Sequence, residues 1–448
     1  MSILLEQARK VARRAQALGA QEAKVVASRS RGVDVEWRDG QLERLSDTTD
    51  QSLSVSLYVD GRFSTHSTSD LRPDSIENFL KQAIDLTRYL EEDPARSLPD
   101  PSGYEGRPQL DLDLHDPAYD NVSGEMRRAE VAELEQLARE ASQHLGEKVI
   151  SVSSSVGDQF AEGARVHTNG FEGYRCGTTF GASVSLNLKE EDGKRPVGGG
   201  YSYRRHRSDL RSFQDIVAEA VENAEGKLGA QKIKTNTYKV IVKNQSIRRL
   251  LGALLSPLSG GALHNKRSMW EGKLNTQIVS PLLTLTDLPH VPRGLGSALW
   301  DGDGYVTHER PIIENGVLKT YLIGDYYAKK MSQERGETIQ RTGSALHNFS
   351  WSYGDQDLAA LIADIGDGVL IDRFLGGNSN GTTGLFSFGC GGHMIRNGQL
   401  AEPLTEVNMS GQLGDLWSNL IAIGNDAYPE GSAHSPSCVF DGVQLSGV

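Results

Sequence analysis

The stretch TTFGASVSLNL, residues 178–188, is the clearest strand signal in the chain. Apolar and polar side chains alternate along it, so every second residue would share one face of an extended strand. The residues that share the apolar face are Phe180, Ala182, Val184, Leu186 and Leu188. Such alternation is typical of an antiparallel sheet with one face on a core and the other in water. The stretch therefore predicts an antiparallel sheet that is covered on one face.

Further strands and helices are predicted on both sides of this stretch. Strands are predicted for residues 22–28, 33–38 and 53–59, with Asp-Gly turns at 39–40 and 60–61. Apolar residues at helical spacing predict helices over residues 4–18, 74–90, 131–145 and 213–224. Gly19 would end the first helix, and Asp74 with Glu77 would form a capping box at the start of the second.

Two segments divide the chain. Residues 93–120 are rich in Pro, Asp and Gly and are interpreted as a linker or long surface loop. Residues 227–237 are polar and mark a domain boundary. A strand at 238–242 and an apolar segment at 247–258 follow, and then many short strands with Asn-Gly turns, as at 315–316. We therefore predict an α+β protein: an N-terminal α/β domain with an antiparallel sheet, residues 1–228, and a C-terminal β-rich domain with few helices, residues 236–448.

Composition restricts the location and the partners. The 448 residues carry a formal net charge of −12, which disfavours a nucleic-acid partner. The basic cluster Arg204–Arg207 is interpreted as a solvated strand end. The sequence shows neither a signal-peptide pattern nor an apolar run long enough for a membrane span, and its three cysteines suit a reducing compartment. We expect a cytoplasmic protein that does not enter a membrane.

Metal-binding patterns fail on spacing. A metallopeptidase helix needs two histidines one turn apart with a glutamate base, whereas His308-Glu309 is followed by Arg310-Pro311. Asp301-Gly302-Asp303-Gly304 lacks the later oxygen ligands of a calcium loop and is interpreted as a turn between strands.

Nucleophile and phosphate patterns fail in the same way. Ser387 lies in Gly-Leu-Phe-Ser-Phe-Gly, one residue away from the spacing of a hydrolase elbow, with no helix pattern after it. Cys390 and His393 are three residues apart and would point to opposite faces of a strand, which favours a buried cysteine and an ordinary histidine. The glycines at 198–200 and 376–377 lack the context of a phosphate loop. We therefore assign no catalytic, cofactor-binding or metal-binding residue to this chain.

An ordered set of motifs in the C-terminal half resembles the TldD/TldE (PmbA) peptidase family. The motifs are DGDGYVTHERPIIENGVLKTYL at 301–322, DYYAKKM at 325–331, RTG at 341–343, GLFSFGCGGHMIRNG at 384–398, EPLTE at 402–406, SG at 410–411 and IGND at 423–426. Chain length and the N-terminal helix and strands also fit, so the resemblance covers the whole chain.

Within that family, TldD-type subunits carry a His-Glu-x-x-x-His helix early in the C-terminal domain. The corresponding segment here, IRRLLGALLSPLSGGALH at 247–264, has no His-Glu pair and a single histidine at its end, while KRSMWEG at 266–272 still matches. The resemblance therefore implies a TldE/PmbA-type subunit without the metal motif. It implies a heterodimer with a zinc-bearing TldD-type partner, which cleaves unfolded polypeptides or matures modified peptides by leader removal inside an enclosed chamber.

Two alternatives stay open. One is a self-sufficient enzyme that uses Cys390 with His393. The other is a non-hydrolytic homodimer with a binding or regulatory role, in keeping with the family's older name as a gyrase modulator.

Overall fold

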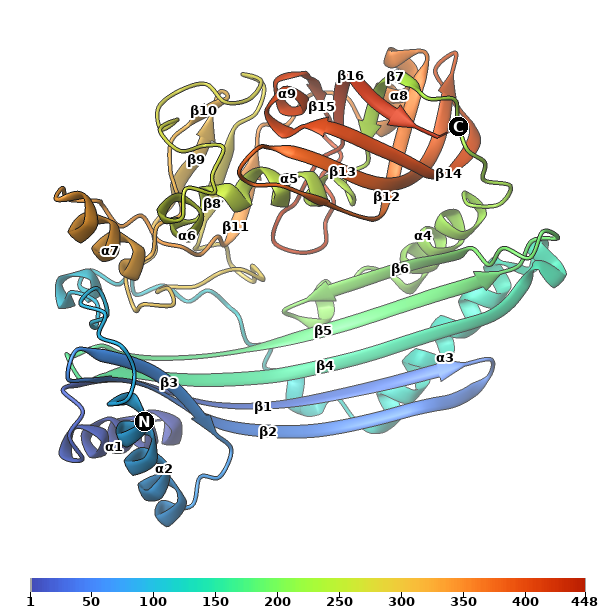
Figure 1. The fold of residues 1–448 in the computed structure, drawn as a ribbon. Coiled ribbons are helices and arrows are strands. Elements are labelled where there is room, and N and C mark those ends of the chain that lie inside the picture. Colours follow the sequence, from blue (N-terminus) through green and yellow to red (C-terminus); the bar gives the residue numbers. More distant parts are fainter. Residues whose placement is uncertain (1, 448) are drawn as a thin grey trace.

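The first half of the chain builds one large antiparallel sheet. In the computed structural model, which describes residues 2–447, its strand order is β3-β2-β1-β4-β5-β6 (Figure 1). The strands are β1 (Glu22–Arg38), β2 (Gln41–Val59), β3 (Arg62–Thr68), β4 (Val149–His167), β5 (Glu172–Leu188) and β6 (Val197–Arg204). The antiparallel sheet is confirmed. The strands predicted at 22–28 and 33–38 are one continuous strand, because β1 pairs with β2 from Glu22 to Arg38 and with β4 from Lys24 to Arg38.

Four helices cover one face of this sheet (Figure 1). They are α1 (Ile3–Ala17), α2 (Pro73–Thr87), α3 (Gly124–Ala141) and α4 (Phe213–Glu225). Helices α1 and α2 bury apolar side chains of residues 23–27 in β1, 53–59 in β2 and 164–166 in β4. Helices α3 and α4 bury those of residues 152–156 in β4 and 182–188 in β5. Gly19 follows α1 with a φ of 111°, as predicted for its end. The predicted capping box on α2 is wrong: the helix starts at Pro73 without a side-chain cap, and Glu77 pairs with Arg14 of α1.

The triple glycine at 198–200 lets α4 lie directly on β6. A Cβ atom at Gly198 would stand 2.1 Å from the backbone nitrogen of Ala224, and one at Gly200 would stand 2.0 Å from the carbonyl oxygen of Ile216. Neither position has room for any side chain. These glycines therefore serve helix–strand packing.

The second half of the chain forms a barrel and a smaller sheet. The barrel strands are β7 (Asn236–Val242), β12 (Gly368–Ser379), β13 (Leu385–Arg396), β14 (Gln399–Gln412) and β16 (Cys438–Ser446), with β15 (Leu420–Ile423) attached to β16. Because β16 pairs with both β7 and β14, the sheet closes on itself. The four-stranded sheet β10-β9-β8-β11 consists of β8 (Leu285–Leu288), β9 (Arg310–Glu314), β10 (Val317–Leu318) and β11 (Asn348–Trp351).

The helices of this half are short. They are α5 (Ile247–Leu255), α6 (Gly260–His264), α7 (Asp325–Arg335), α8 (Leu358–Ile365) and α9 (Leu413–Ser418). The predicted α+β class, with a β-rich C-terminal half, is confirmed. No helix within residues 2–447 has the length and apolar character needed to cross a membrane. The predicted boundary at 228–236 falls between α4 and β7, and we propose it as the limit between two domains.

The segment predicted as a linker or surface loop is fixed to the C-terminal half. We call residues 93–118 the strap. The Asp93 carboxylate accepts a hydrogen bond from Tyr326 at 2.8 Å, and the amide of Asp100 donates to the hydroxyl of Tyr305 at 3.1 Å. Near its other end, Asp113 pairs with Arg293 at 2.6 Å. The strap therefore holds the two halves of the chain together along its length.

Candidate functional site

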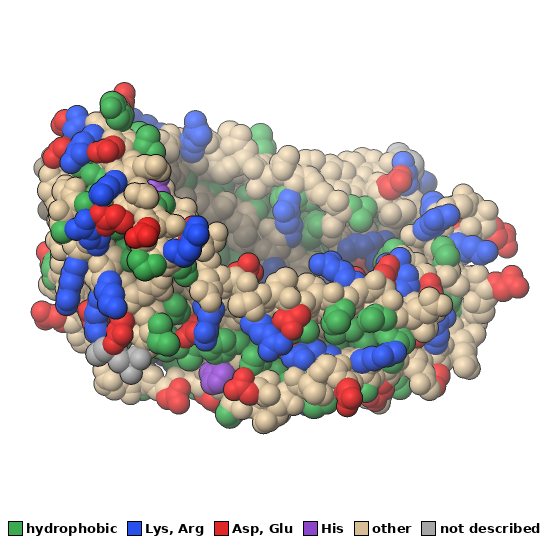
Figure 2. All heavy atoms as spheres, turned by 90° about the horizontal axis from the view of Figure 1, so that it is seen from below, with side chains coloured by type: hydrophobic (Ala, Val, Ile, Leu, Met, Phe, Trp, Pro, Cys, Tyr) green, Lys and Arg blue, Asp and Glu red, His purple; other side chains and the backbone are tan. Residues whose placement is uncertain are grey.

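The face of the first sheet that carries no helices lines a hollow. Its side chains are small or polar, because they alternate with the apolar ones beneath the helices. The hollow has a volume of about 700 Å³ and is closed on its other side by residues 295–302 and 345–347 of the C-terminal half. A second hollow of about 430 Å³ continues over the same face and shares Ser30, Asp50 and Gln159. Figure 2 shows the molecule deeply hollowed in the view from below, with Lys and Arg side chains within the hollow.

Three arginines from neighbouring strands line the larger hollow. Arg165 on β4 donates from Nη1 to the carbonyl oxygens of Asp301 and Gly302, at 2.8 and 2.6 Å. Arg205, just after β6, donates from Nη2 to the carbonyl oxygen of Leu295 at 2.8 Å. Arg175 on β5 is exposed. The guanidinium carbons of Arg165 and Arg175 lie 4.9 and 5.4 Å from the ring centroid of the buried Trp300.

These arginines lack acidic partners. Within residues 2–447, no carboxylate forms an ion pair with Arg165, Arg175 or Arg205. The acids in the same lining are Asp50, Glu162 and Asp301, of which Glu162 pairs with Arg29 and Asp301 with Arg341. Burial and the neighbouring Arg175 lower the pKa of Arg165 to about 10, and burial also lowers the pKa of Arg205. The hollow is thus a positively charged site in an acidic protein.

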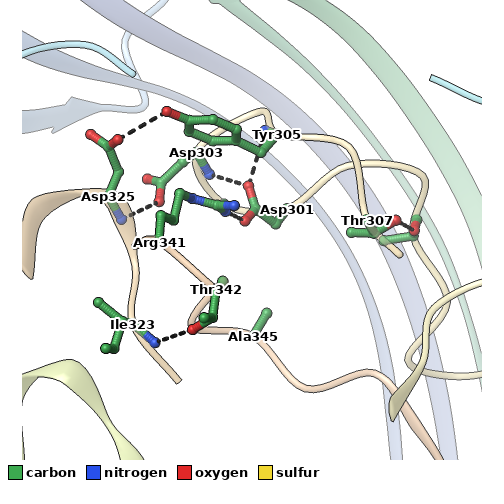
Figure 3. A network of polar contacts seen from close by, with 12 residues as sticks. Asp301, Asp303, Tyr305, Thr307, Ile323, Asp325, Arg341, Thr342 and Ala345 are labelled. Carbon is green, nitrogen blue, oxygen red and sulfur yellow. Dashed lines mark hydrogen bonds and ion pairs between the residues drawn. The ribbon is translucent and has the colours of Figure 1, made fainter. Parts of the chain in front are cut away.

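The turn at residues 301–304 directly follows Trp300 and provides the carbonyl oxygens that accept hydrogen bonds from Arg165. The Oδ1 of Asp301 accepts hydrogen bonds from the amides of Asp303 and Tyr305, at 2.9 and 3.1 Å (Figure 3). Arg341 pairs with the same carboxylate and lies 3.8 Å from the ring centroid of Tyr305. The Asp301–Gly304 stretch is therefore a turn, as predicted, whose aspartate is saturated by protein donors.

The other candidates from the sequence do not assemble into a site. His308 and Glu309 are both exposed. Ser387 is a strand residue whose hydroxyl donates to Asn408 at 3.0 Å. Cys390 is buried, and burial raises the pKa of its thiol to about 12, while His393 lies 3.3 Å from Asp372. Among residues 2–447, no group of three or more His, Cys, Asp or Glu side chains is arranged to hold a metal ion.

The first part of the segment at 247–264, which the resemblance aligns with the family's metal helix, is α5. Its leucines lie in the core of the C-terminal half. Its first turn faces other groups: Arg248 donates to the hydroxyl of Tyr201 at 3.2 Å, and Arg249 donates to the carbonyl oxygen of Gly377. Tyr201 lines the smaller hollow, so this hydrogen bond links α5 to one residue of that lining. Helix α5 itself has no His, Cys, Asp or Glu side chain that could bind zinc, and His264, the one histidine of the segment at 247–264, pairs with Glu334.

The solvated strand end predicted at 204–207 is wrong. Arg204 pairs with Glu430, which is fully buried, and Arg207 pairs with Glu130. His206 is buried against the strap, and Arg205 points into the hollow. Four consecutive basic residues are equally compatible with a solvent-exposed strand end and with one whose side chains are held by protein contacts. Only the three-dimensional structure distinguishes these two arrangements. No sequence pattern predicted that Arg165, Arg175 and Trp300 would lie in one site, because they come from three separate segments of the chain.

His167 gives the sheet beneath the strap a pH dependence. Its Nδ1 lies 3.0 Å from the hydroxyl of Tyr104, and burial, with Lys24 and Arg165 nearby, lowers its pKa to about 3. The unfolded chain binds this proton near pH 6.5, so stability is present above that pH and is lost as the pH falls. We expect His167 to contribute a loss of about 2 kcal/mol in unfolding free energy between pH 6.5 and 5. Urea unfolding should show a shallower decline for His167→Gln, and equal slopes would contradict this.

Comparisons with known proteins agree with this architecture. Three family models match: PmbA/TldA metallopeptidase domain 1 at residues 23–87, the central domain at 119–228 and the C-terminal domain at 235–447. The first two share the single sheet β1–β6. The curated protein "Metalloprotease PmbA" of Escherichia coli O157:H7 is 27% identical over 95% of this chain and 92% of its own length.

Solved structures extend this agreement over the full length. A Bacteroides thetaiotaomicron protein described as a putative modulator of DNA gyrase is 37% identical, with a TM-score of 0.93 over 99% of this chain and 98% of that one. TldE from Thermococcus kodakarensis shares the fold, with a TM-score of 0.83 at 20% identity over 98% of this chain and 100% of that one. The family models match most of the chain, and the 37% identical relative covers 99% of it. This chain therefore belongs to the PmbA/TldD family of metallopeptidases.

Proposed function

We propose that this chain is the non-catalytic, TldE/PmbA-type subunit of a heterodimeric zinc peptidase. Its TldD-type partner supplies the zinc and the activated water, and the pair acts in the cytoplasm on unfolded polypeptides or on modified peptides during leader removal. One observation carries the proposal. Helix α5 has Arg248, Arg249 and leucines at the place where the resemblance puts the metal ligands of TldD-type subunits, while the sequence around it still resembles the family.

The hollow suits the role of a chamber wall. Its sheet face offers side chains such as Ser28, Ser30, Ser52 and Gln159, which can exchange hydrogen bonds with an extended backbone of any sequence. A wall that admits only extended chains sets specificity without taking part in the chemistry. Zinc in the partner would polarise the scissile carbonyl group.

Native mass tests the assembly. Light scattering after size-exclusion chromatography should give a one-to-one complex when this chain is mixed with a TldD-type subunit. Zinc in that complex should equal the amount brought by the partner. A stable homodimer that persists in the presence of the partner would favour the regulatory alternative. Stoichiometric zinc in the purified chain alone would contradict the proposal.

The cysteine alternative makes an opposite prediction. A nucleophilic cysteine needs a thiolate, and burial raises the pKa of Cys390 to about 12, far above the operating pH. We expect Cys390→Ala to cleave an unstructured peptide, in complex with the partner, at the wild-type rate within about twofold. Loss of at least tenfold in kcat with unchanged complex mass would restore the cysteine mechanism.

A further inference from the structure

We propose that Arg165, Arg175 and Arg205 form a subsite that binds a carboxylate group of an extended peptide lying in the hollow. That the ligand is a peptide rests on the proposed function. The subsite adds to that function the recognition of one chemical group, a carboxylate, by this subunit itself. The carboxylate is either the C-terminus of the peptide or an Asp or Glu side chain, because both present the same two oxygen atoms.

The three cations converge from separate parts of the fold. Arg165 and Arg175 lie on adjacent strands, where Arg175 stands opposite Gly163 and Arg165 opposite Gly173. A Cβ atom at Gly173 would stand 2.9 Å from the Trp300 ring, so this glycine lets Trp300 lie against the sheet beside Arg165 and Arg175. Arg205 reaches the same hollow from the end of β6, and its Nη1 would stand 3.2 Å from a Cβ atom at Gly177.

The cluster is incomplete without an anion. The hydrogen bonds made by Arg165 and Arg205 go to neutral carbonyl oxygens, and within residues 2–447 no carboxylate forms an ion pair with either side chain. The Nε atoms of both side chains are buried and find no acceptor within residues 2–447. Buried charges in folded proteins are normally paired, since removing an ion from water is costly. Such local exceptions are expected where a ligand binds.

A peptide carboxylate fits this surface better than other anions. Guanidinium groups bind the planar carboxylate through paired hydrogen bonds. The wall beside the arginines includes Leu295 and Leu346, which can cover an apolar side chain next to the carboxylate. The smaller hollow then continues the track over the polar sheet face. A polyanion such as nucleic acid is disfavoured by the net charge of −12.

Three labelled peptides test the subsite on this chain alone. The probes are rhodamine-labelled decapeptides of Gly, Ser and Ala: one with a free C-terminal carboxylate, one with a C-terminal amide, and one amide with a single internal Glu. Fluorescence anisotropy should show at least one carboxylate peptide binding about tenfold more tightly than the plain amide. Which of the two it is identifies the source of the carboxylate.

Matched variants locate the effect. Arg175 is exposed, and only its contact with Trp300 would be lost, so Arg175→Gln should fold normally and reduce the carboxylate preference to less than about twofold. The control Arg195→Gln removes the same charge from an exposed residue outside the hollow and should keep the full preference. Equal affinity for all three peptides, no binding, or a preference that survives Arg175→Gln would overturn the proposal. This measurement involves neither the partner nor cleavage. A negative result would therefore leave the proposed function standing, and failure of the proposed function would leave a measured carboxylate preference standing.

Discussion

Gly200→Ala is expected to lower the unfolding free energy of the N-terminal half by about 3 kcal/mol. The added Cβ atom would stand 2.0 Å from the carbonyl oxygen of Ile216, which is backbone and cannot rotate away. Helix α4 would have to lift off β6, and the buried contacts of Ile216 and Ala220 would open. Urea unfolding followed by circular dichroism measures the loss.

The neighbouring glycine is the matched control for this change. A Cβ atom at Gly199 would lie 3.4 Å from the carbonyl oxygen of Val184, which is ordinary contact. Gly199→Ala should therefore change stability by less than about 1 kcal/mol. If the two alanine variants unfold at the same urea concentration, α4 does not rest on β6 in the way described.

Arg127→Met is expected to cost about 3–5 kcal/mol of stability. Arg127 on α3 binds Asp158 on β4 with both nitrogens of its fork, including Nη2 to Oδ1 at 2.9 Å, and the two side chains are 7% and 3% exposed. The substitution leaves the aspartate buried without a counter-charge beneath the helix. Chemical unfolding of the variant gives the cost directly.

An exposed pair on the same sheet provides the comparison. Arg31 and Asp47 lie 2.8 Å apart and are each 49% exposed, so water screens their attraction. Arg31→Met should cost less than about 1 kcal/mol. Equal losses in Arg127→Met and Arg31→Met would mean that burial does not set the strength of the first pair.

Periodicity predicted the covered parts of the sheet and missed the uncovered parts. Residues 178–188 alternate because helices cover one face of β5 there, and the structure buries that face. Residues 29–32 of β1 are mostly polar because they lie between the two helix pairs, so the sequence appeared to break there. Backbone pairing with β2 and β4 carries the strand through this stretch, and no side-chain pattern reports such pairing.

The hollow was beyond prediction for a related reason. Its arginines come from three separate segments, and only the register of β4 against β5 and the position of residues 295–302 bring them together. Residues 93–120 were interpreted as a linker or long surface loop because they are rich in Pro, Asp and Gly, yet contacts such as Asp93 with Tyr326 fix the strap in place. Motifs local in the sequence, such as the turn at 301–304, were predicted correctly because their donors and acceptors are close along the chain.

Cleavage of an unstructured peptide tests the central claim most directly. This chain, a TldD-type subunit and their equimolar mixture are each assayed with and without a zinc chelator. We predict that the mixture cleaves at least about tenfold faster than either protein alone, that this chain alone has no activity, and that the chelator abolishes cleavage. Cleavage by this chain alone, or cleavage by the partner that this chain does not increase, would contradict the account.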